Sequence, residues 1–192
     1  TSGGVVTTLA GSGSEGSADG TGTAASFSGP SGVAVDGSGN VYVGDSNNNL
    51  VRKITSGGVV TTLAGSGSAG SANGTGTAAS FKFPVGVAVD GSGNVYVADG
   101  NNHLIRKITS GGVVTTLAGG SKGSADGTGT AASFNEPRGV AVDGSGNVYV
   151  GDRTNHLIRK ITSGGVVTTL AGSGSSGSAN GTGTAASFYN PN

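Results

Sequence analysis

The sequence contains no cysteine, no methionine and no tryptophan among its 192 residues. Without cysteine, disulfide frameworks, thiolate catalysis and cysteine-ligated zinc sites are all excluded. Charged residues are scarce as well, at 10% of the chain, and ten basic residues balance ten acidic ones. Proteins that bind nucleic acid or anionic membranes need a surplus of basic charge, so we expect neither partner. No apolar run is long enough to cross a membrane as a helix.

Glycine is abundant instead, with 41 residues, about three times its usual share. The chain is also internally repetitive. The string Gly-Val-Ala-Val-Asp-Gly-Ser-Gly-Asn-Val-Tyr-Val occurs three times, and Val-Val-Thr-Thr-Leu-Ala-Gly occurs four times. One phenylalanine recurs at intervals of 54, 53 and 54 residues, as Phe27, Phe81, Phe134 and Phe188. Periods of this length are typical of solenoids, propellers and repeat arrays.

Each repeat contains four short segments rich in Val, Ile, Thr and Tyr, which favour strands. In the first complete repeat they are residues 32–35, 40–43, 50–54 and 59–64. Tight turns rich in Gly, Ser and Asp join the first strand to the second and the third to the fourth. The first strand is wholly apolar, so we expect both of its faces to be buried, and apolar content falls toward the fourth. This pattern predicts an all-β β-propeller of four-stranded antiparallel blades, with the repeated phenylalanines wedged between adjacent blades.

We interpret the chain as one repeat domain with three complete blades, at residues 32–65, 86–119 and 139–172. Residues 1–31 read as the leading outer strand and linker of a partial blade, and residues 173–192 as a linker toward a missing blade. Three blades do not close a propeller, which takes four to eight. We expect a six-bladed ring, formed either by a homo-oligomer of two chains or within a longer chain. The near-identity of the repeats indicates either an engineered, consensus-like sequence or a recently amplified natural array.

Further motifs lie at the entry to the third strand. Residues 102–104 and 155–157 read Asn-His-Leu, whereas residues 48–50 read Asn-Asn-Leu. With the strings Pro-x-Gly-Val-Ala-Val-Asp and Asn-Val-Tyr-Val-x-Asp, these motifs resemble NHL repeats over essentially the whole chain, in the extended form of bacterial repeat proteins. The resemblance implies a ring used mostly for binding and, for a natural protein, an extracellular or periplasmic location. Some relatives on this fold are metal-dependent lyases or hydrolases, and fold alone does not choose between them.

Differences between the repeats gather in two of the four connections. Because strand direction alternates, the first-to-second and third-to-fourth turns lie on one face of a blade, and these turns are identical in every copy. The other two connections share the opposite face and vary in charge and size. This predicts a recognition surface on a constant scaffold, against the alternative that loops simply tolerate change. The candidate binding residues are Glu15, Ser28, Ser31, Ser46, Asn47, Asn49, Lys82, Phe83, Val85, His103, Lys122, Asn135, Glu136, Arg138, Arg153, Thr154, His156 and Tyr189.

Asp45, Asp99 and Asp152 end the second strand of each blade and are weak candidates for a metal site, because hard cations prefer several oxygen ligands. Alternatively, each aspartate caps its own loop or pairs with an arginine of the neighbouring strand. We predict no catalytic residue and no cofactor. The preferred function is a non-catalytic binding or scaffold module for an unknown protein, peptide or glycan. The alternative is a cation-dependent lyase or hydrolase that uses these aspartates with His103 and His156.

Overall fold

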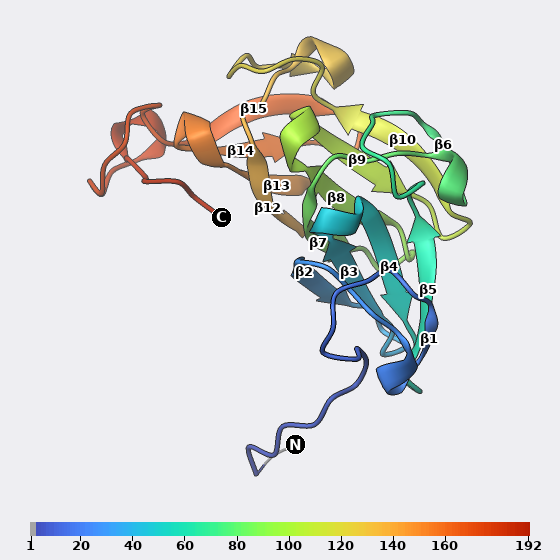
Figure 1. The fold of residues 1–192 in the computed structure, drawn as a ribbon. Coiled ribbons are helices and arrows are strands. Elements are labelled where there is room, and N and C mark those ends of the chain that lie inside the picture. The colour runs from blue at the N-terminus through green and yellow to red at the C-terminus, as the bar shows by residue number, and fades with distance from the viewer. Residues whose placement is uncertain (1–2) are drawn as a thin grey trace.

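The computed structural model describes residues 3–192 and contains three five-stranded antiparallel sheets that fan out side by side (Figure 1). The first sheet has the order β1-β5-β4-β3-β2. Its strands are β1 (Gly20–Thr21), β2 (Pro30–Val35), β3 (Val41–Asp45), β4 (Leu50–Ile54) and β5 (Val59–Ala64). The second and third sheets repeat this order with β6 (Gly74–Thr75), β7 (Pro84–Val89), β8 (Val95–Asp99), β9 (Leu104–Ile108), β10 (Val113–Ala118), β11 (Gly127–Thr128), β12 (Pro137–Val142), β13 (Val148–Asp152), β14 (Leu157–Ile161) and β15 (Val166–Ala171).

Single 3₁₀ turns occupy the connections. They are η1 (Gly22–Ala24), η2 (Ser46–Asn48), η3 (Gly76–Ala78), η4 (Gly100–Asn102), η5 (Gly129–Ala131), η6 (Arg153–Asn155) and η7 (Gly183–Ala185). None of the helices in the described residues is long and apolar enough to span a membrane.

The all-β propeller architecture predicted from the sequence is confirmed, with differences at the strand boundaries. β4 and β5 have the predicted limits, whereas β2 begins two residues earlier and β3 ends two residues later than expected. The prediction of four strands per blade is wrong by one, because the linker adds a short fifth strand, β1, whose Gly20 and Thr21 pair with Val60 and Val59.

The expected leading outer strand is not formed. Residues 5–10 carry the same Val-Val-Thr-Thr-Leu-Ala string as β5 but form no strand. The string pairs on both sides in β5, with β4 and with β1. The chain described here places no such pair of strands around residues 5–10, and strand propensity alone does not make a sheet.

The turn between β2 and β3 is closed by one aspartate. The Asp36 carboxylate accepts hydrogen bonds from the backbone N–H groups of Ser38 and Asn40, both at 2.9 Å, and from the Tyr42 hydroxyl at 3.0 Å. Its bonds to Asn40, above all the side-chain one, lower the pKa of Asp36 to about 2. Asp90 and Asp143 make the same contacts in the other blades. The constancy of this turn therefore has a structural cause.

Apolar side chains fill the spaces between neighbouring blades. Phe81 is fully buried in a cluster that joins Tyr42 and Val51 of the first blade to Val87 of the second, and Phe134 is buried between the second and third blades. Both therefore wedge between blades as predicted, whereas Phe27 and Phe188 are only partly buried, because in the described chain no blade precedes the first or follows the third.

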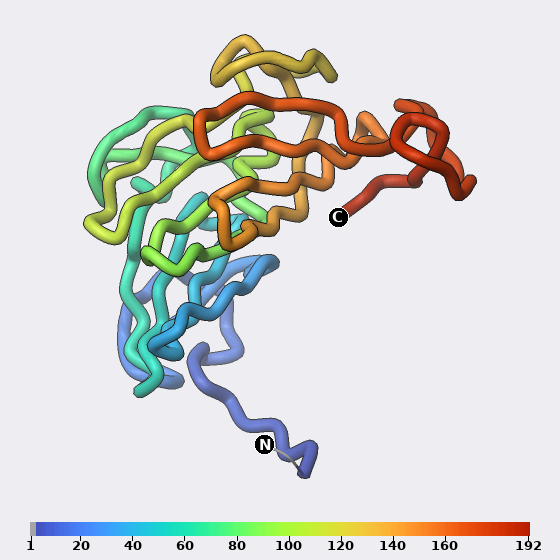
Figure 2. Tube along the Cα trace, turned by 180° about the vertical axis from the view of Figure 1, so that it is seen from behind, coloured from blue at the N-terminus to red at the C-terminus, as the bar shows by residue number. Residues whose placement is uncertain are grey.

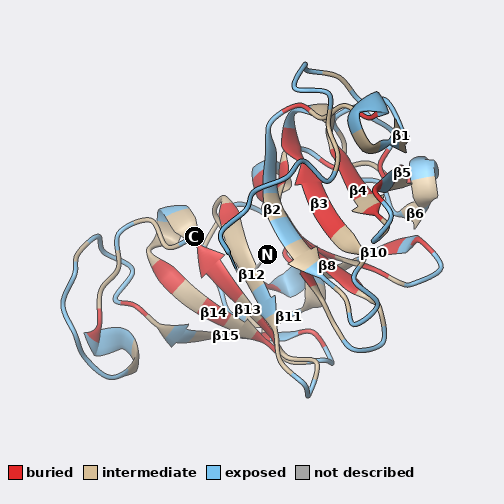
Figure 3. Ribbon diagram, turned by 90° about the horizontal axis from the view of Figure 1, so that it is seen from below, coloured by how far each residue is buried: buried red, intermediate tan, exposed pale blue. Residues whose placement is uncertain are grey.

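The expectation that the inner strand is buried on both faces holds only for the middle blade. Val87 on β7 is 6% exposed, but its counterpart Val33 on β2 is 67% exposed. The inner strand of the third blade, β12, is exposed on its other face. Ala141 there points away from the second blade and is exposed. Figure 3 shows this contrast between exposed residues on β2 and the buried β3 beside it. An inner strand loses both solvent faces only when blades flank it on both sides.

Glycine is required where the inner strands meet. A Cβ on Gly86 would collide with the carbonyl oxygen of Arg138, and a Cβ on Gly32 would collide with that of Val85. The blades are thus in backbone contact at the centre of the fan and diverge outward. The whole forms an open arc, and the backbone trace ends on its open side at both termini (Figure 2).

Candidate functional site

The variable connections come together on one face of the arc, which we call the loop face. It comprises residues 46–49, 100–103 and 153–156 with the linker ends 28–31, 82–85, 135–138 and 189–192. Backbone hydrogen bonds join the two kinds of connection, since Asn47 N–H donates to the Ser28 carbonyl and Asn101 N–H to the Lys82 carbonyl, both at 3.1 Å. The constant turns meet on the opposite face, where the Cβ position of Gly39 lies 3.7 Å from Cβ of Ser56.

One loop-face position links each repeat to the next. Asn49, His103 and His156 all adopt left-handed backbone conformations, with φ near 57° (55°, 59° and 57°). Asn49 Oδ1 accepts the backbone N–H of Phe83 at 3.0 Å, and His103 Nδ1 accepts that of Glu136 at 3.1 Å. His156 Nδ1 plays the same part in the third repeat. This position therefore needs an acceptor, which either Asn or neutral His supplies.

Burial lowers the pKa of His103, and the charge of nearby Lys122 lowers it further. The imidazole is thereby held in the neutral form that can accept the Glu136 N–H. Because Nδ1 is engaged in this bond, the metal-ligating role considered for the histidines is left with Nε2 alone.

Other variable residues contact one another in matched pairs. The Arg138 guanidinium lies over the Phe83 ring at 5.4 Å, and Arg153 forms a 2.9 Å ion pair with Glu136. Tyr189 stacks on His156 with ring centroids 6.0 Å apart. Part of the variation between repeats is thus explained by complementarity within the face.

The candidate binding residues differ in how far a ligand could reach them. Ser28 and Ser46 are buried, and the Ser46 hydroxyl donates to the Pro84 carbonyl at 2.6 Å, inside the contact between blades. The exposed candidates are Glu15, Ser31, Asn47, Lys82, Lys122, Thr154 and Tyr189. The partly buried ones are Asn49, Phe83, Val85, His103, Asn135, Glu136, Arg138, Arg153 and His156.

The aspartates considered for a metal site are buried in ion pairs. Asp45 Oδ2 accepts from Arg52 at 2.9 Å and from Asn48 at 2.9 Å, while Oδ1 accepts the N–H of Ser28 at 2.8 Å. Asp99 and Asp152 repeat this arrangement with Arg106 and Arg159. The alternative interpretation, a loop cap paired with arginine, therefore describes these residues correctly, because their oxygens face arginine and backbone donors.

Burial raises the pKa of Asp99 and Asp152, although the arginines and neighbouring N–H donors act in the opposite direction. Within residues 3–192 there is no group of three or more His, Asp or Glu side chains placed to hold a metal ion.

The sequence analysis missed what each arginine does besides pairing. Arg52 also donates to the carbonyls of Ser26 and Ala18 and to Asp19 at 2.7 Å, so it holds the linker that precedes its own blade. In the second repeat Asn73 replaces the aspartate, and its Oδ1 accepts from Arg106 at 2.8 Å. The sequence did carry a signal for this contact, since each repeat has one invariant arginine and one position that is always Asp or Asn.

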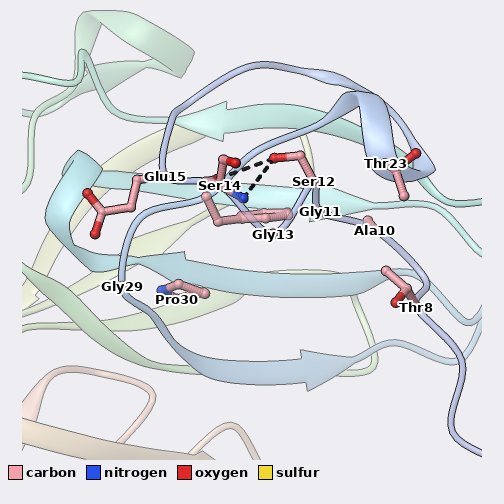
Figure 4. A pocket seen from close by; sticks show the side chains of 11 residues that line it. Thr8, Ala10, Gly11, Ser12, Gly13, Ser14, Glu15, Thr23, Gly29 and Pro30 are labelled. Carbon is pink, nitrogen blue, oxygen red and sulfur yellow. Dashed lines mark hydrogen bonds between the residues drawn. The ribbon is translucent and has the colours of Figure 1, made fainter.

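A hollow of about 590 Å³ lies outside the first blade, between residues 8–15 and the linker end around Gly29 and Pro30 (Figure 4). Glycine, serine and threonine make up most of its lining, and the Ser12 hydroxyl makes local hydrogen bonds with the backbone of Ser14 along its edge. Glu15 is its one charged residue. The lining of this hollow therefore does not bring two catalytic side chains together.

The comparisons with known proteins bear on both function classes. The NHL repeat family model matches residues 27–54, 81–108 and 134–161, one match in each blade. NHL repeat-containing protein 2 of Gallus gallus is 41% identical over 98 residues, which are 50% of this chain but 13% of that protein. The chain thus spans only a small part of this relative.

Among solved structures, a Bacteroides thetaiotaomicron protein of unknown function is 28% identical with a TM-score of 0.67, over 84% of this chain and 40% of that one. An auxiliary nutrient binding protein from the same organism is 22% identical with a TM-score of 0.64, over 83% of this chain and 41% of that one. A streptogramin B lyase shares the fold at 17% identity and a TM-score of 0.52, over 74% of this chain and 40% of that one. Binding proteins and enzymes therefore both occur on this fold. With one NHL match in each of its three blades, the chain belongs to the NHL-repeat proteins of propeller fold.

Proposed function

We propose that the chain is a non-catalytic binding module that uses the loop face to bind an acidic segment of a protein partner. The observation that carries the proposal is the distribution of charge. Setting aside the Asp-or-Asn position that receives each arginine, all charges that differ between repeats lie in the loop-face connections or the linkers leading to them. They are Glu15, Lys82, Lys122, Glu136, Arg138 and Arg153.

The basic residues among these are in surplus at the junction of the second and third blades. Lys82 and Lys122 both lie close enough to His103 for their charges to lower its pKa. Arg138 lies over Phe83 nearby, whereas Glu136 is already paired with Arg153. Basic groups grouped in this way attract anionic partners and speed their association.

The enzyme alternative finds less support. Its aspartates are enclosed in arginine pairs, and each histidine uses Nδ1 to hold the next repeat. An active site also needs unlike groups that converge on one reacting position, whereas the aspartates recur in every blade and the histidines occupy one equivalent position in two blades. Metal analysis of the purified protein tests this directly, and stoichiometric zinc or manganese would favour the enzyme.

Binding is tested with a fluorescein-labelled poly-glutamate peptide, titrated at low and at high salt, with poly-lysine as the opposite-charge probe. The variant Lys82→Asn, Lys122→Ala, Arg138→Val replaces each base with the residue that another repeat carries at that position. We expect it to lose at least about tenfold in affinity, roughly 1.4 kcal/mol, while its melting temperature is retained.

Lys107→Gln is the matched control, because it removes a positive charge that lies over Tyr96 on β9, away from the loop face. Equal affinity of the triple variant and the unmodified protein, or loss of its fold, would refute the assignment of these positions to recognition. The proposal includes an extracellular or periplasmic location, which the family resemblance favours and which fractionation of expressing cells would test.

A further inference from the structure

The two ends of the arc present faces that, elsewhere in the same chain, pack against each other. We call the face of a blade that is turned toward the preceding blade its leading face, and the opposite one its trailing face. On the second blade the leading face includes Val87, which is buried in one cluster with Tyr42 of the first blade, and Val89, which is partly buried against that cluster. On the first blade the equivalent leading-face residues Val33 and Val35 are 67% and 60% exposed.

The trailing face of the third blade is open in the same way. Ala141, Tyr149, Ile158 and Leu170 there correspond to Ala34, Tyr42, Val51 and Leu63, which in the first blade pack against the second. Leu170 is 47% exposed. A shallow hollow of about 230 Å³ lies on this face beside Ala141 and Tyr149.

We propose that a second copy of this chain docks its leading face onto this trailing face, and that the reciprocal contact closes a ring of six blades. The geometry is the one that the chain already uses twice, between its first and second and between its second and third blades. The residues on the two open faces are of the same types as those that meet at the two junctions within the chain. A head-to-tail contact that closes on itself gives a finite assembly, whereas one that does not close gives a filament.

Two nearly identical segments, one from each copy, would occupy the same place in the docked pair, so one of them must be displaced. Residues 5–31 and 166–192 carry the same string apart from five positions. Asn192 lies against Gly139 just as Val85 lies against Gly32 in the first junction. In the docked pair, the second copy's residue 31 takes the place that Asn192 occupies in the single chain.

Residues 173–192 are the segment that is displaced when the second copy docks. The linker before each blade is held by the arginine of that blade, as Arg52 holds the Ala18 carbonyl and Asp19. No arginine in the described chain holds Ala179 or Asn180, the counterparts of Ala18 and Asp19, so this segment has fewer bonds to lose.

The test is the molar mass of the purified 192-residue chain by size-exclusion chromatography with light scattering. We expect twice the 18.0 kDa of one chain. Val33→Glu with Val35→Glu places two charges in the docked interface and is expected to give a folded monomer. Val113→Glu is the control, because Val113 is 42% exposed on β10 of the middle blade, away from both end faces, and its variant is expected to remain a dimer.

A second measurement covers the case in which the glutamate variants fail to fold. Since the chain has no cysteine, the variant Val33→Cys with Ala141→Cys is expected to form disulfides between copies under mild oxidation, giving a covalent dimer on non-reducing gels. A monomer at every concentration, an open-ended series of oligomers, or a dimer that survives Val33→Glu with Val35→Glu would each overturn the proposal.

Discussion

Replacing Phe81 with alanine tests whether the blades are held together by the repeated phenylalanine. The ring is fully buried between Tyr42 and Val51 of the first blade and Val87 of the second. A Phe→Ala change in such a core costs about 3–5 kcal/mol. The Arg106 guanidinium, 5.2 Å from the ring centre, also loses a cation–π contact of about 0.5–2 kcal/mol. We expect a total loss of about 3.5–7 kcal/mol, and a melting temperature lowered by roughly 7–28 °C.

The assay is urea unfolding followed by far-ultraviolet circular dichroism, with tyrosine fluorescence as a second probe because the chain lacks tryptophan. Phe188→Ala is the matched control. Phe188 occupies the same place in its repeat but is only partly buried, so its loss should cost about 1 kcal/mol. Equal losses in the two variants would show that burial between blades does not govern the effect, and the reasoning would be refuted.

Three further outcomes are expected. Arg106→Ala should destabilise the fold by about 3–5 kcal/mol in thermal unfolding, because it leaves the buried Asp99 carboxylate without its cation; a loss below 1 kcal/mol would contradict this. His103→Ala should cost about 1–3 kcal/mol by orphaning the Glu136 N–H, whereas His103→Asn, which copies the first repeat, should be nearly neutral. The hydrogen bonds of Asp36 hold its folded pKa at about 2, below the ordinary 3.8, so their contribution is complete above about pH 4 and is lost as pH falls toward 2; melting temperatures that stay constant over that interval would count against it.

Local sequence patterns predicted the central part of each blade well. The limits of β4 and β5 follow from segments rich in Val, Ile, Leu and Thr that are bounded by Asn-rich and Gly-rich connections. The short strand β1 could not be found in this way, because one strand-favouring Thr beside a Gly in a Ser- and Gly-rich linker gives no recognisable strand pattern. It lies beside β5 because Arg52, more than 30 residues further along, holds the linker there.

The candidate site was predicted less completely than the fold. Comparison of the repeats located the variable loops, but variation does not distinguish exposure from mutual packing. Ser46 varies between repeats, yet it faces Ser31 and the Pro84 carbonyl, not solvent. His103 was considered as a metal ligand, yet its partner is a backbone N–H 33 residues away. Such pairings depend on how blades stack, which a single repeat does not encode.

Each arginine forms hydrogen bonds to the linker that precedes its blade. These bonds determine which stretch of the chain forms one complete structural unit. Arg106 donates hydrogen bonds to the carbonyls of Ser80 and Ala72, so the linker belongs structurally to the blade that follows it. A duplication or deletion whose ends fall just after Ala64 and Ala118 moves a linker, an arginine and its aspartate together. A chain cut inside the linker would lose the linker oxygens and leave the buried arginine with the aspartate of its own blade as its remaining partner. An array that begins at a position equivalent to residue 65 therefore keeps each arginine together with the linker that it holds.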